Sequence, residues 1–533
     1  MSHLYLPNTH SPMHISKLFR TGILVVLLFQ GIYSSAQEIV ELKQPKSGKV
    51  VIKLMFRNGS ISDPAGKEGL TYLTSNLMVN GGTESHSAAE IQKLIYPWAA
   101  RMSVFTDKEV STFSFEVPTE YLMEFFSLIQ EIILRPGFKE TDFDRLISNQ
   151  KNYVDEVIRQ SSDEEYGKKY LEYVLFKGTP YEHLTQGDSK SLAGLTKDDV
   201  FTHYRRAYTR SNLVIGIAGD YPNEFAEKMQ ATFNQLPEGP APIAELVLPE
   251  PVKGIYVDII SKESAIGTAI SAGFPMNLTR QSPDFAALMV ANSWFGEHRK
   301  SYSRLYQKIR EQRSMNYGDY SYIEWYENGG GNMLPVSGTP RQMNYFSIWL
   351  RPVQTAKSLK SQYPGLDSLK EGHARFALKM ALREYSQIIN NGLTQEQFEE
   401  TRNFLLSYTK LYIETTSKKL GFLMDSKFYG RTNWIAELEK EFQHLKLEDV
   451  NTAMKNYWLK DQMNIVIITD KSEVEGLKAG LESGSPATMV YSPALQSSLP
   501  EEIYVDDREV SIFPMPVVEV HVINSNETFG KRK

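Results

Sequence analysis

The chain has 533 residues, of which 41% are hydrophobic and 23% charged, and this balance excludes a mainly disordered, collagen-like or polytopic membrane protein. Its 58 Lys and Arg residues against 64 Asp and Glu residues leave a net charge of -6. The chain therefore lacks the excess of positive charge that is typical of nucleic-acid-binding proteins. The absence of cysteine excludes disulfides, thiolate nucleophiles and cysteine-ligated metals, so any metal site would need histidines and carboxylates.

The N-terminus predicts an export signal. Residues 22–29 (GILVVLLF) form an unbroken apolar run after Lys17 and Arg20, and Ser34 to Ala36 supply small residues at the distance of a cleavage site. The run is shorter than the ~20 residues that span a membrane, so a membrane anchor is the less favoured alternative. We expect residues 1–36 to be a cleaved signal peptide and the mature protein to be soluble, periplasmic or extracellular, with no membrane attachment.

The first half of the mature chain is expected to mix strands and helices without strict alternation. Residues 50–56 (VVIKLMF) predict a strand, and residues 110–117 (VSTFSFEV) alternate like another. Helices are predicted at 88–94, 120–134 and 142–159. This order predicts an α+β fold in which helices cover a mainly antiparallel sheet.

An internal duplication is indicated by two pairs of similar segments that occur in the same order. Residues 195–220 (LTKDDVFTHYRRAYTRSNLVIGIAGD) and 445–470 (LKLEDVNTAMKNYWLKDQMNIVIITD) align without a gap. Each predicts a helix, a short break and a buried strand. Upstream, 137–146 (GFKETDFDRL) matches 392–401 (GLTQEQFEET), where a glycine and an N-cap region precede a long amphipathic helix. These matches predict that the fold is built from two copies of one architecture.

The boundary between the two copies is placed in a proline-rich segment. Residues 236–251 (LPEGPAPIAELVLPEP) contain five prolines and no sustained periodicity, which predicts an extended linker. The two domains are then 37–235 and 252–481. The tail, 482–533, begins with Ser, Pro and Gly and ends in an alternating segment, 517–522, that is expected to add an edge strand.

Residues 64–83 (PAGKEGLTYLTSNLMVNGGT) resemble the insulinase (pitrilysin) family of zinc peptidases. In that family this helix carries H-x-x-E-H: two histidines at i and i+4 bind one zinc ion, and the glutamate activates the bound water. Here Tyr72, Ser75 and Asn76 occupy the three positions. A phenol, a hydroxyl and an amide are poor substitutes for two zinc-binding imidazoles and a general base. The phenol, with a pKa of ~10, stays protonated at neutral pH, and serine is not basic enough to activate water. The chain is therefore expected to hold no zinc or other cofactor of its own.

The resemblance also implies a third ligand, a glutamate on a later helix. Asp155 and Glu156 are the candidates, and we expect them to be ordinary helix-surface acids because one carboxylate does not hold zinc alone. The chain contains neither H-x-x-E-H nor H-E-x-x-H. The histidines outside the signal region include no i, i+4 pair; they are His86, His183, His203, His298, His373, His444 and His521.

The second half retains a different family pattern in residues 303–317 (SRLYQKIREQRSMNY). Leu305 and Ile309 have helical spacing with basic residues opposite, so a solvated amphipathic helix is the plain interpretation. The stretch also resembles the family's S-R-L-x-x-x-[IL]-R-E-x-x-x-x-Y, in which Arg310 and Tyr317 match the Arg and the Tyr. In the family these side chains reach across a chamber to the substrate. Both can donate hydrogen bonds to a peptide carbonyl as it becomes an oxyanion.

Three other features are expected to be structural. The glycines at 329–331 lack the context of a phosphate-binding loop and predict a flexible turn. The Ser-His-Ser sequence at 85–87 predicts a loop into the next helix. An aromatic cluster predicts a strand face or core, with the lining of a peptide groove as the alternative; its members are Tyr317, Tyr320, Tyr322, Trp325 and Tyr326.

The resemblance spans about residues 40–470 and implies two similar α+β rolls, insulinase-like domains that close around a large chamber. It also implies a family that occurs either as one long chain or as two chains. We therefore expect an exported, zinc-free subunit that supplies Arg310 and Tyr317 to a partner chain carrying the zinc motif. Unfolded peptide would bind as an added strand on a sheet edge. The alternatives are a non-enzymatic peptide-binding or scaffold protein and a peptidase with a different metal site.

Overall fold

The computed structural model describes residues 38–240, 245–263, 265–297, 300–326, 334–363 and 365–529. The predicted signal peptide and the predicted turn at 329–331 lie outside these residues. Where the structure describes the chain, no helix has both the length and the apolar run that crossing a membrane requires. From Gln37 onward the chain clusters as one compact unit, so contacts between its two halves belong to one body.

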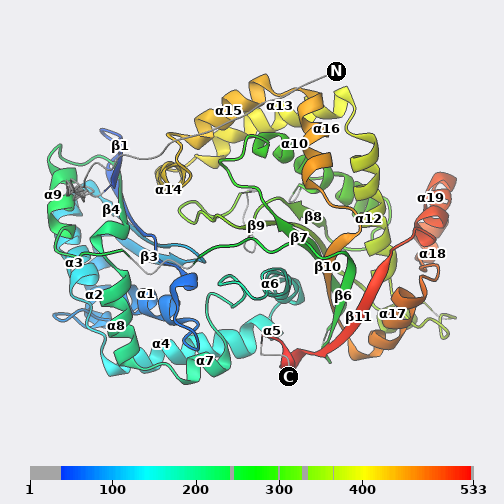
Figure 1. The fold of residues 1–533 in the computed structure, drawn as a ribbon, viewed down its shortest axis with the longest axis horizontal. Helices are drawn as coiled ribbons and strands as arrows, with labels where there is room; N and C mark the ends of the chain where they lie inside the picture. The colour runs from blue at the N-terminus through cyan, green and yellow to red at the C-terminus, as the bar shows by residue number, and fades with distance from the viewer. Residues whose placement is uncertain are drawn as a thin grey trace, which may run out of the picture. The chain divides into compact units, whose positions relative to one another are not determined.

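The first half builds a five-stranded sheet in the order β1-β5-β2-β4-β3 (Figure 1). Its strands, β1 to β5, are Glu38–Lys43, Lys49–Phe56, Arg101–Thr106, Ser111–Pro118 and Leu213–Gly219. Its helices are α1 (Leu70–Asn80), α2 (Ala88–Ile95), α3 (Leu122–Leu134), α4 (Glu140–Asn152), α5 (Ile158–Gln160), α6 (Asp163–Leu175), α7 (Ser189–Ala193), α8 (Lys197–Ala207) and α9 (Phe225–Phe233).

The second half builds a six-stranded sheet in the order β11-β6-β10-β7-β9-β8. Its strands, β6 to β11, are Gly254–Ser261, Gly267–Met276, Asp319–Tyr322, Asn344–Gln354, Gln462–Thr469 and Val517–Asn524. Its helices are α10 (Phe285–Gly296), α11 (Ala356–Gln362), α12 (Ala374–Asn391), α13 (Gln395–Tyr412), α14 (Thr416–Phe428), α15 (Trp434–His444), α16 (Leu447–Tyr457), α17 (Lys471–Ser483), α18 (Pro493–Gln496) and α19 (Glu501–Ser511).

The two sheets share one topology once β11 is set aside. In the first, β1 pairs in parallel with β5, and all other pairs are antiparallel. In the second, β6 pairs in parallel with β10, and β10, β7, β9 and β8 continue in antiparallel order. The repeated segments also match in structure, because α8 and α16 each lead into the parallel strand of their sheet, β5 and β10. The predicted fold class, two duplicated α+β domains, is confirmed.

Each sheet is covered on one face by its own helices and on the other by a helix of the opposite half. Helices α3 and α9 cover the first sheet, and α14 of the second half packs against the other face of β1, β2 and β5 (Figure 1). Helices α12 and α17 cover the second sheet, and α6 of the first half packs against the other face of β7, β9 and β10. We call this arrangement the helix exchange.

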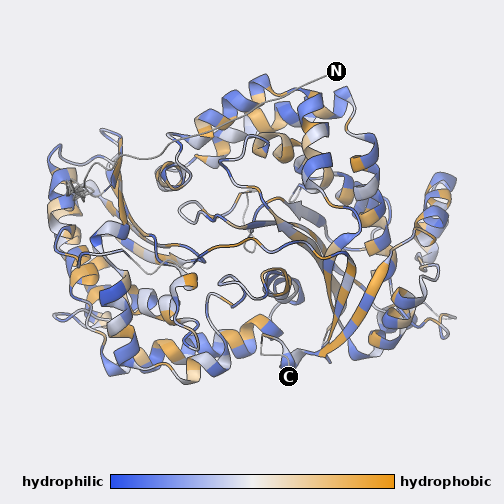
Figure 2. Cartoon of the chain, in the orientation of Figure 1, coloured by the Kyte–Doolittle hydropathy of each residue, from blue (hydrophilic) through white to orange (hydrophobic). Residues whose placement is uncertain are grey.

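The helix exchange explains the apolar sequences of the central strands. In β2, Val50 and Ile52 face the core of their own half, whereas Val51 and Met55 pack with Met424 of α14. A strand buried on both faces is expected to be hydrophobic at nearly every position. Helices with one exposed face differ from these strands in their sequence pattern. Helices α13 and α15 carry both hydrophobic and hydrophilic stripes (Figure 2).

The elements predicted in the first half are present with small shifts in their bounds. The strands predicted at 50–56 and 110–117 are β2 and β4, and the helices predicted at 88–94 and 120–134 correspond to α2 and α3. The helix predicted at 142–159 is interrupted, because Tyr153–Val157 forms a π-helical turn between α4 and α5. Residues 234–240 and 245–253 form neither helix nor strand, and the alternating tail segment lies in β11 at the edge of the second sheet.

Candidate functional site

Helix α1, which carries the degenerate zinc-motif positions, begins at a backbone turn that only glycine adopts easily. Gly69 has φ +92°, and a Cβ atom there would lie 2.5 Å from the carbonyl oxygen of Gln186. The Asp63 carboxylate accepts hydrogen bonds from the Gly69 N–H at 2.7 Å and from the Thr71 N–H at 2.7 Å. Burial raises the pKa of Asp63 to about 7, so this capping carboxyl is held in an enclosed environment.

Ser75 and Asn76, at two of the three motif positions, make hydrogen bonds to neutral groups. The Ser75 hydroxyl is buried and lies 2.6 Å from the Thr106 hydroxyl. The Asn76 amide donates to the backbone oxygen of Tyr72 at 2.9 Å. Catalytic zinc sites use three basic protein ligands, and no such donor is present here. The family's zinc ion therefore does not fit α1 of this chain.

Two cavities meet at α1, and both are lined by Tyr72 and Tyr153. The first has a volume of about 220 Å3, and the second, of about 570 Å3, is also lined by Asn76. Tyr153 is the first residue of the π-helical turn after α4. The side chain that faces the same cavities as Tyr72 from this helix is thus a second phenol. Sequence reasoning missed it because a π-turn shifts which residues of a helix share a face.

The carboxylates proposed as remnants of a third ligand lie elsewhere. Neither Asp155 nor Glu156 lines either cavity. Asp155 accepts a hydrogen bond from the Ser189 hydroxyl and lies 3.6 Å from Arg159, while Glu156 is exposed. Within the described ranges no group of three or more His, Asp or Glu side chains is arranged to hold a metal ion.

A buried ionic cluster, the Arg341 cluster, lines the first cavity and joins the two halves. Arg341 of the second half contacts both oxygens of Asp107 at 2.6 Å and Glu172 of α6 at 3.0 Å. Lys108 lies 3.1 Å from the other oxygen of Glu172. Burial alone would raise the pKa of Glu172, but the two cations lower it to about 2. Every charge here is paired, which indicates a structural clamp.

The segment with the retained family pattern forms a π-helix over Tyr306–Glu311. Leu305 and Ile309 are fully buried, as their spacing predicts. The prediction of an α-helix is wrong in its hydrogen bonding, since the Gln312 N–H bonds the carbonyl of Gln307, five residues earlier, at 3.1 Å. π-helical turns are rare and frequent at functional sites, and in this chain they occur in both candidate regions.

The structure brings Arg310 and Tyr317 together. The Arg310 guanidinium lies 5.1 Å from the ring centroid of Tyr317 and 4.6 Å from that of Tyr306. Both distances fit cation–π stacking. Tyr317 is 75% exposed, so the stack faces solvent. Neither Arg310 nor Tyr317 lines the two cavities at Tyr72.

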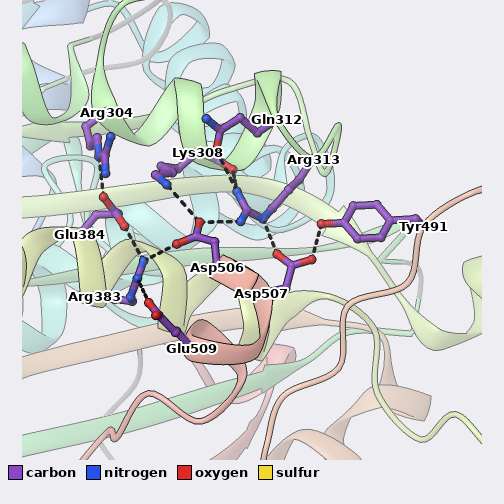
Figure 3. A network of polar contacts seen from close by, with 10 residues as sticks. All are labelled: Arg304, Lys308, Gln312, Arg313, Arg383, Glu384, Tyr491, Asp506, Asp507 and Glu509. Carbon is purple, nitrogen blue, oxygen red and sulfur yellow. Dashed lines mark hydrogen bonds and ion pairs between the residues drawn. The ribbon is translucent and has the colours of Figure 1, made fainter. Parts of the chain in front are cut away.

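Arg310 differs from the other basic residues of its segment. Arg304 pairs with Glu384 at 2.5 Å, Lys308 pairs with Asp506 at 3.0 Å, and Arg313 pairs with both Asp506 and Asp507 (Figure 3). Among the described residues, by contrast, no carboxylate lies within ion-pair distance of Arg310. Its charge is oriented by two aromatic rings and left available to a ligand.

The remaining predicted features are structural. The residues at 85–87 form a loop that ends at the N-cap of α2, where Ser87 and Glu90 make a capping box. Tyr320, Tyr322, Tyr326 and Trp349 form a small buried cluster, which confirms the core interpretation of the aromatic group. Tyr326 also lines the first cavity. Tyr317 is separate from this cluster because it is exposed.

Comparison with known proteins shows that both halves of the chain match models of one peptidase family. Residues 38–187 match the family model described as insulinase (peptidase family M16), and residues 194–405 match the peptidase M16 inactive domain. A non-peptidase homologue, YmxG, of Helicobacter pylori is 23% identical over 84% of this chain and 98% of its own length. A relative in Bacillus subtilis, named an uncharacterised zinc protease YmxG, is 21% identical over 79% of this chain and 94% of its own length.

Solved structures show the same fold. The crystal structure of a peptidase M16 inactive domain from Pseudomonas fluorescens superimposes with a TM-score of 0.69 and 21% identity. The match covers 82% of this chain and 96% of that one. The relatives' names point to both active and inactive proteins, so the chemistry of this chain has to be argued from its own residues.

Proposed function

Because the chain belongs to the insulinase family, peptidase family M16, we propose that it is the zinc-free, substrate-binding subunit of a two-chain peptidase whose other chain carries the zinc motif. The chain itself is a family homologue in which Tyr72, Ser75 and Asn76 replace the zinc ligands and the general base. In this proposal it acts after export, outside the cytoplasm, on unfolded peptides.

The observation that carries the proposal is the contrast between α1 and the Arg310–Tyr317 stack. Helix α1 has lost every group that zinc chemistry needs, while Arg310 is preorganised by Tyr306 and Tyr317 with no carboxylate beside it among the described residues. A guanidinium and a phenol in this state can donate to an oxyanion that forms at a partner's zinc. Among the described residues Arg310 contacts two aromatic rings and no carboxylate, an arrangement that suits a cation that binds a ligand oxygen.

The first sheet supports peptide binding at its edge. β3 is the outer strand of the sheet, and Arg101 and Ser103 on it are exposed. An outer strand presents unpaired backbone N–H and C=O groups to which an extended peptide can add. Met102 and Val104 on the same strand line the cavities at Tyr72, which offers pockets for the side chains of such a peptide.

The proposal is tested by reconstitution with a zinc-bearing homologue. The mature chain alone is expected to cleave no peptide, and the mixture is expected to show zinc-dependent cleavage. Arg310→Ala should lower kcat of the mixture by about 100-fold, the usual loss when an oxyanion donor is removed. The matched control is Arg508→Ala, which removes an exposed arginine that pairs, within the described part of the chain, only with Glu501. Robust zinc-dependent cleavage by the isolated chain would overturn the assignment.

A second candidate is a peptide-binding or scaffold protein with no catalytic partner. The exposure of Tyr317 and its absence from the cavities at Tyr72 favour this reading. The same variants separate the two candidates. If Arg310→Ala and Tyr317→Phe leave the kinetics of every reconstituted pair unchanged but weaken peptide binding to the isolated chain, the protein is a binding module.

A further inference from the structure

We propose that Asp506 and Asp507 of the tail helix α19 are positioning residues for the Arg310–Tyr317 stack. This inference rests on the function proposed above, and it assigns a role to a tail that lies beyond both matched family models, which end by residue 405.

The segment that carries Arg310 cannot hold its own shape. The π-helix spans only Tyr306–Glu311, and a single helical stretch of this length is not stable in water. The chain after it turns through Ser314, whose φ is +52°, a strained value for a residue with a side chain. Buried Leu305 and Ile309 attach one face of the segment to the core.

The carboxylates of α19 hold the segment on both sides of Arg310. Lys308 Nζ lies 3.0 Å from Asp506, and Arg313 Nη2 lies 2.7 Å from the same carboxylate. Arg313 Nε lies 2.8 Å from Asp507 (Figure 3). Arg310 is between these two anchored cations in sequence. Fixing Lys308 and Arg313 therefore fixes the direction in which Arg310 projects.

The acid pair is itself anchored to other parts of the domain. Asp506 also contacts Arg383 of α12 at 2.8 Å, and the Tyr491 hydroxyl donates to Asp507 at 2.6 Å (Figure 3). The Arg313 side chain is fully buried, so its charge depends on these two carboxylates. Removing the partners of a buried charge forces the side chain to move toward water, because an unpaired buried ion is strongly disfavoured.

The test is hydrogen–deuterium exchange of the full mature chain carrying Asp506→Asn and Asp507→Asn together. Backbone amides of residues 303–317 are expected to exchange at least about tenfold faster than in the wild type, because local opening becomes easier. The matched control is Glu501→Gln with Glu502→Gln, two exposed acids on the same helix that do not contact the segment. Asp506→Glu with Asp507→Glu should restore the wild-type exchange of this segment.

Two exchange results would overturn the inference. Unchanged exchange at 303–317 in the asparagine variant would show that α19 does not hold the segment. Faster exchange spread evenly over the chain, including α1 and β2, would show that the acid pair stabilises the fold in general.

Kinetics of the reconstituted pair separate this inference from the proposed function. If Arg310 acts on substrate, the asparagine variant should lower kcat by about tenfold or more with little change in KM, and the combined variant should lose no more activity than Arg310→Ala alone. Independent, additive losses would overturn the positioning role. If Arg310→Ala alone has no effect, the proposed function fails, and the exchange experiment still decides whether α19 orders the segment.

Discussion

At the residue scale, α1 keeps its place in the fold without the side chains of the family's zinc motif. Thr71 and Gly69 keep the start of α1 in place through Asp63. Tyr72 and Asn76 still line a shared cavity one helical turn apart, but they offer neutral groups. The scaffold of the site is intact, and only its donor atoms have changed.

Restoring imidazoles to this scaffold tests which residue occupies the third ligand position. Tyr72→His with Asn76→His should bind zinc weakly, and adding Tyr153→Glu should lower the zinc Kd by at least about tenfold, because catalytic zinc sites use three protein ligands. The comparison is made by competition with a chelator, with Tyr153→Phe as the control in place of the glutamate. Equal affinity with and without Tyr153→Glu would show that position 153 is not the third ligand position.

Glu109, between β3 and β4, makes stability depend on pH. Burial raises the pKa of Glu109 from an ordinary 4.5 to about 7, although the Gln342 N–H and the Tyr181 hydroxyl donate to it. Between these two pH values the folded protein holds more protons than the unfolded chain, so the stability contributed by this group falls as pH rises. Above pH ~7 that contribution is lost.

Glu109→Gln is therefore expected to become stabilising relative to the wild type as pH rises. The amide keeps both accepted hydrogen bonds and never ionises. The difference in unfolding free energy should grow between pH 4.5 and pH 8 by as much as about 3 kcal/mol, at about 1.4 kcal/mol for each pKa unit. Urea unfolding at the two pH values measures it. An equal difference at both would contradict the assignment of the raised pKa to Glu109.

At the scale of single elements, α14 stabilises a sheet that is not its own. Leu420 and Met424 are fully buried in a cluster with Val51 and Met55 of β2. Gly216 on β5 allows this close approach, since a Cβ atom there would lie 2.4 Å from the Met424 sulfur. Packing of this density leaves little room for relaxation when a side chain is removed.

Leu420→Ala should destabilise the protein by about 2–5 kcal/mol, the usual result of deleting a buried leucine side chain. Leu411→Ala is the matched control, because Leu411 lies on neighbouring α13 and is 46% exposed. Its effect should stay within about 0.5 kcal/mol. Denaturant unfolding of both variants measures the difference. Similar losses of unfolding free energy in both would show that packing of α14 on the first sheet contributes little to stability.

At the scale of the whole molecule, the two halves are joined by the helix exchange and by the Arg341 cluster. The side chains of Ile260, Val466 and Ile468 of the second sheet lie in the hydrophobic core of the first half. Arg341 adds a buried charge pair with Asp107 across the same boundary. Neither half buries its strands completely without the other, so we expect the halves to fold as one cooperative unit.

A chain ending at residue 240 is expected to fold poorly, because the face of β2 that contacts α14 would be exposed to water. It should bind a hydrophobic dye and melt without a sharp transition, and adding residues 245–533 in trans should suppress both effects. Circular dichroism and dye fluorescence measure this. A sharp melting transition and no dye binding by the isolated half would contradict the structural role of the helix exchange.

Sequence patterns predicted the helices and strands more accurately than the residues that surround Tyr72 in the candidate site. The duplication and the strands β2 and β5 follow from periodicity and self-similarity, which are local properties of the chain, whereas the helix α1 was implied by the family resemblance. The π-turns were missed, since both stretches have ordinary helical periodicity and the extra residue in the turn is set by packing. The residue of this stretch that lines both cavities is Tyr153, whereas the candidates from the sequence were Asp155 and Glu156.

The amino-acid sequence alone was enough to show that α1 carries none of the side chains of H-x-x-E-H, because this depends only on which residues are present. It also determined the fold class, because the same topology is encoded twice. The tertiary structure was needed to show that α6 and α14 pack on each other's sheets, that Arg341 lines the cavity at Tyr72, and that the tail carboxylates pair with Lys308 and Arg313. These are contacts between residues far apart in the chain, and a local pattern carries no information about which buried surface will meet which.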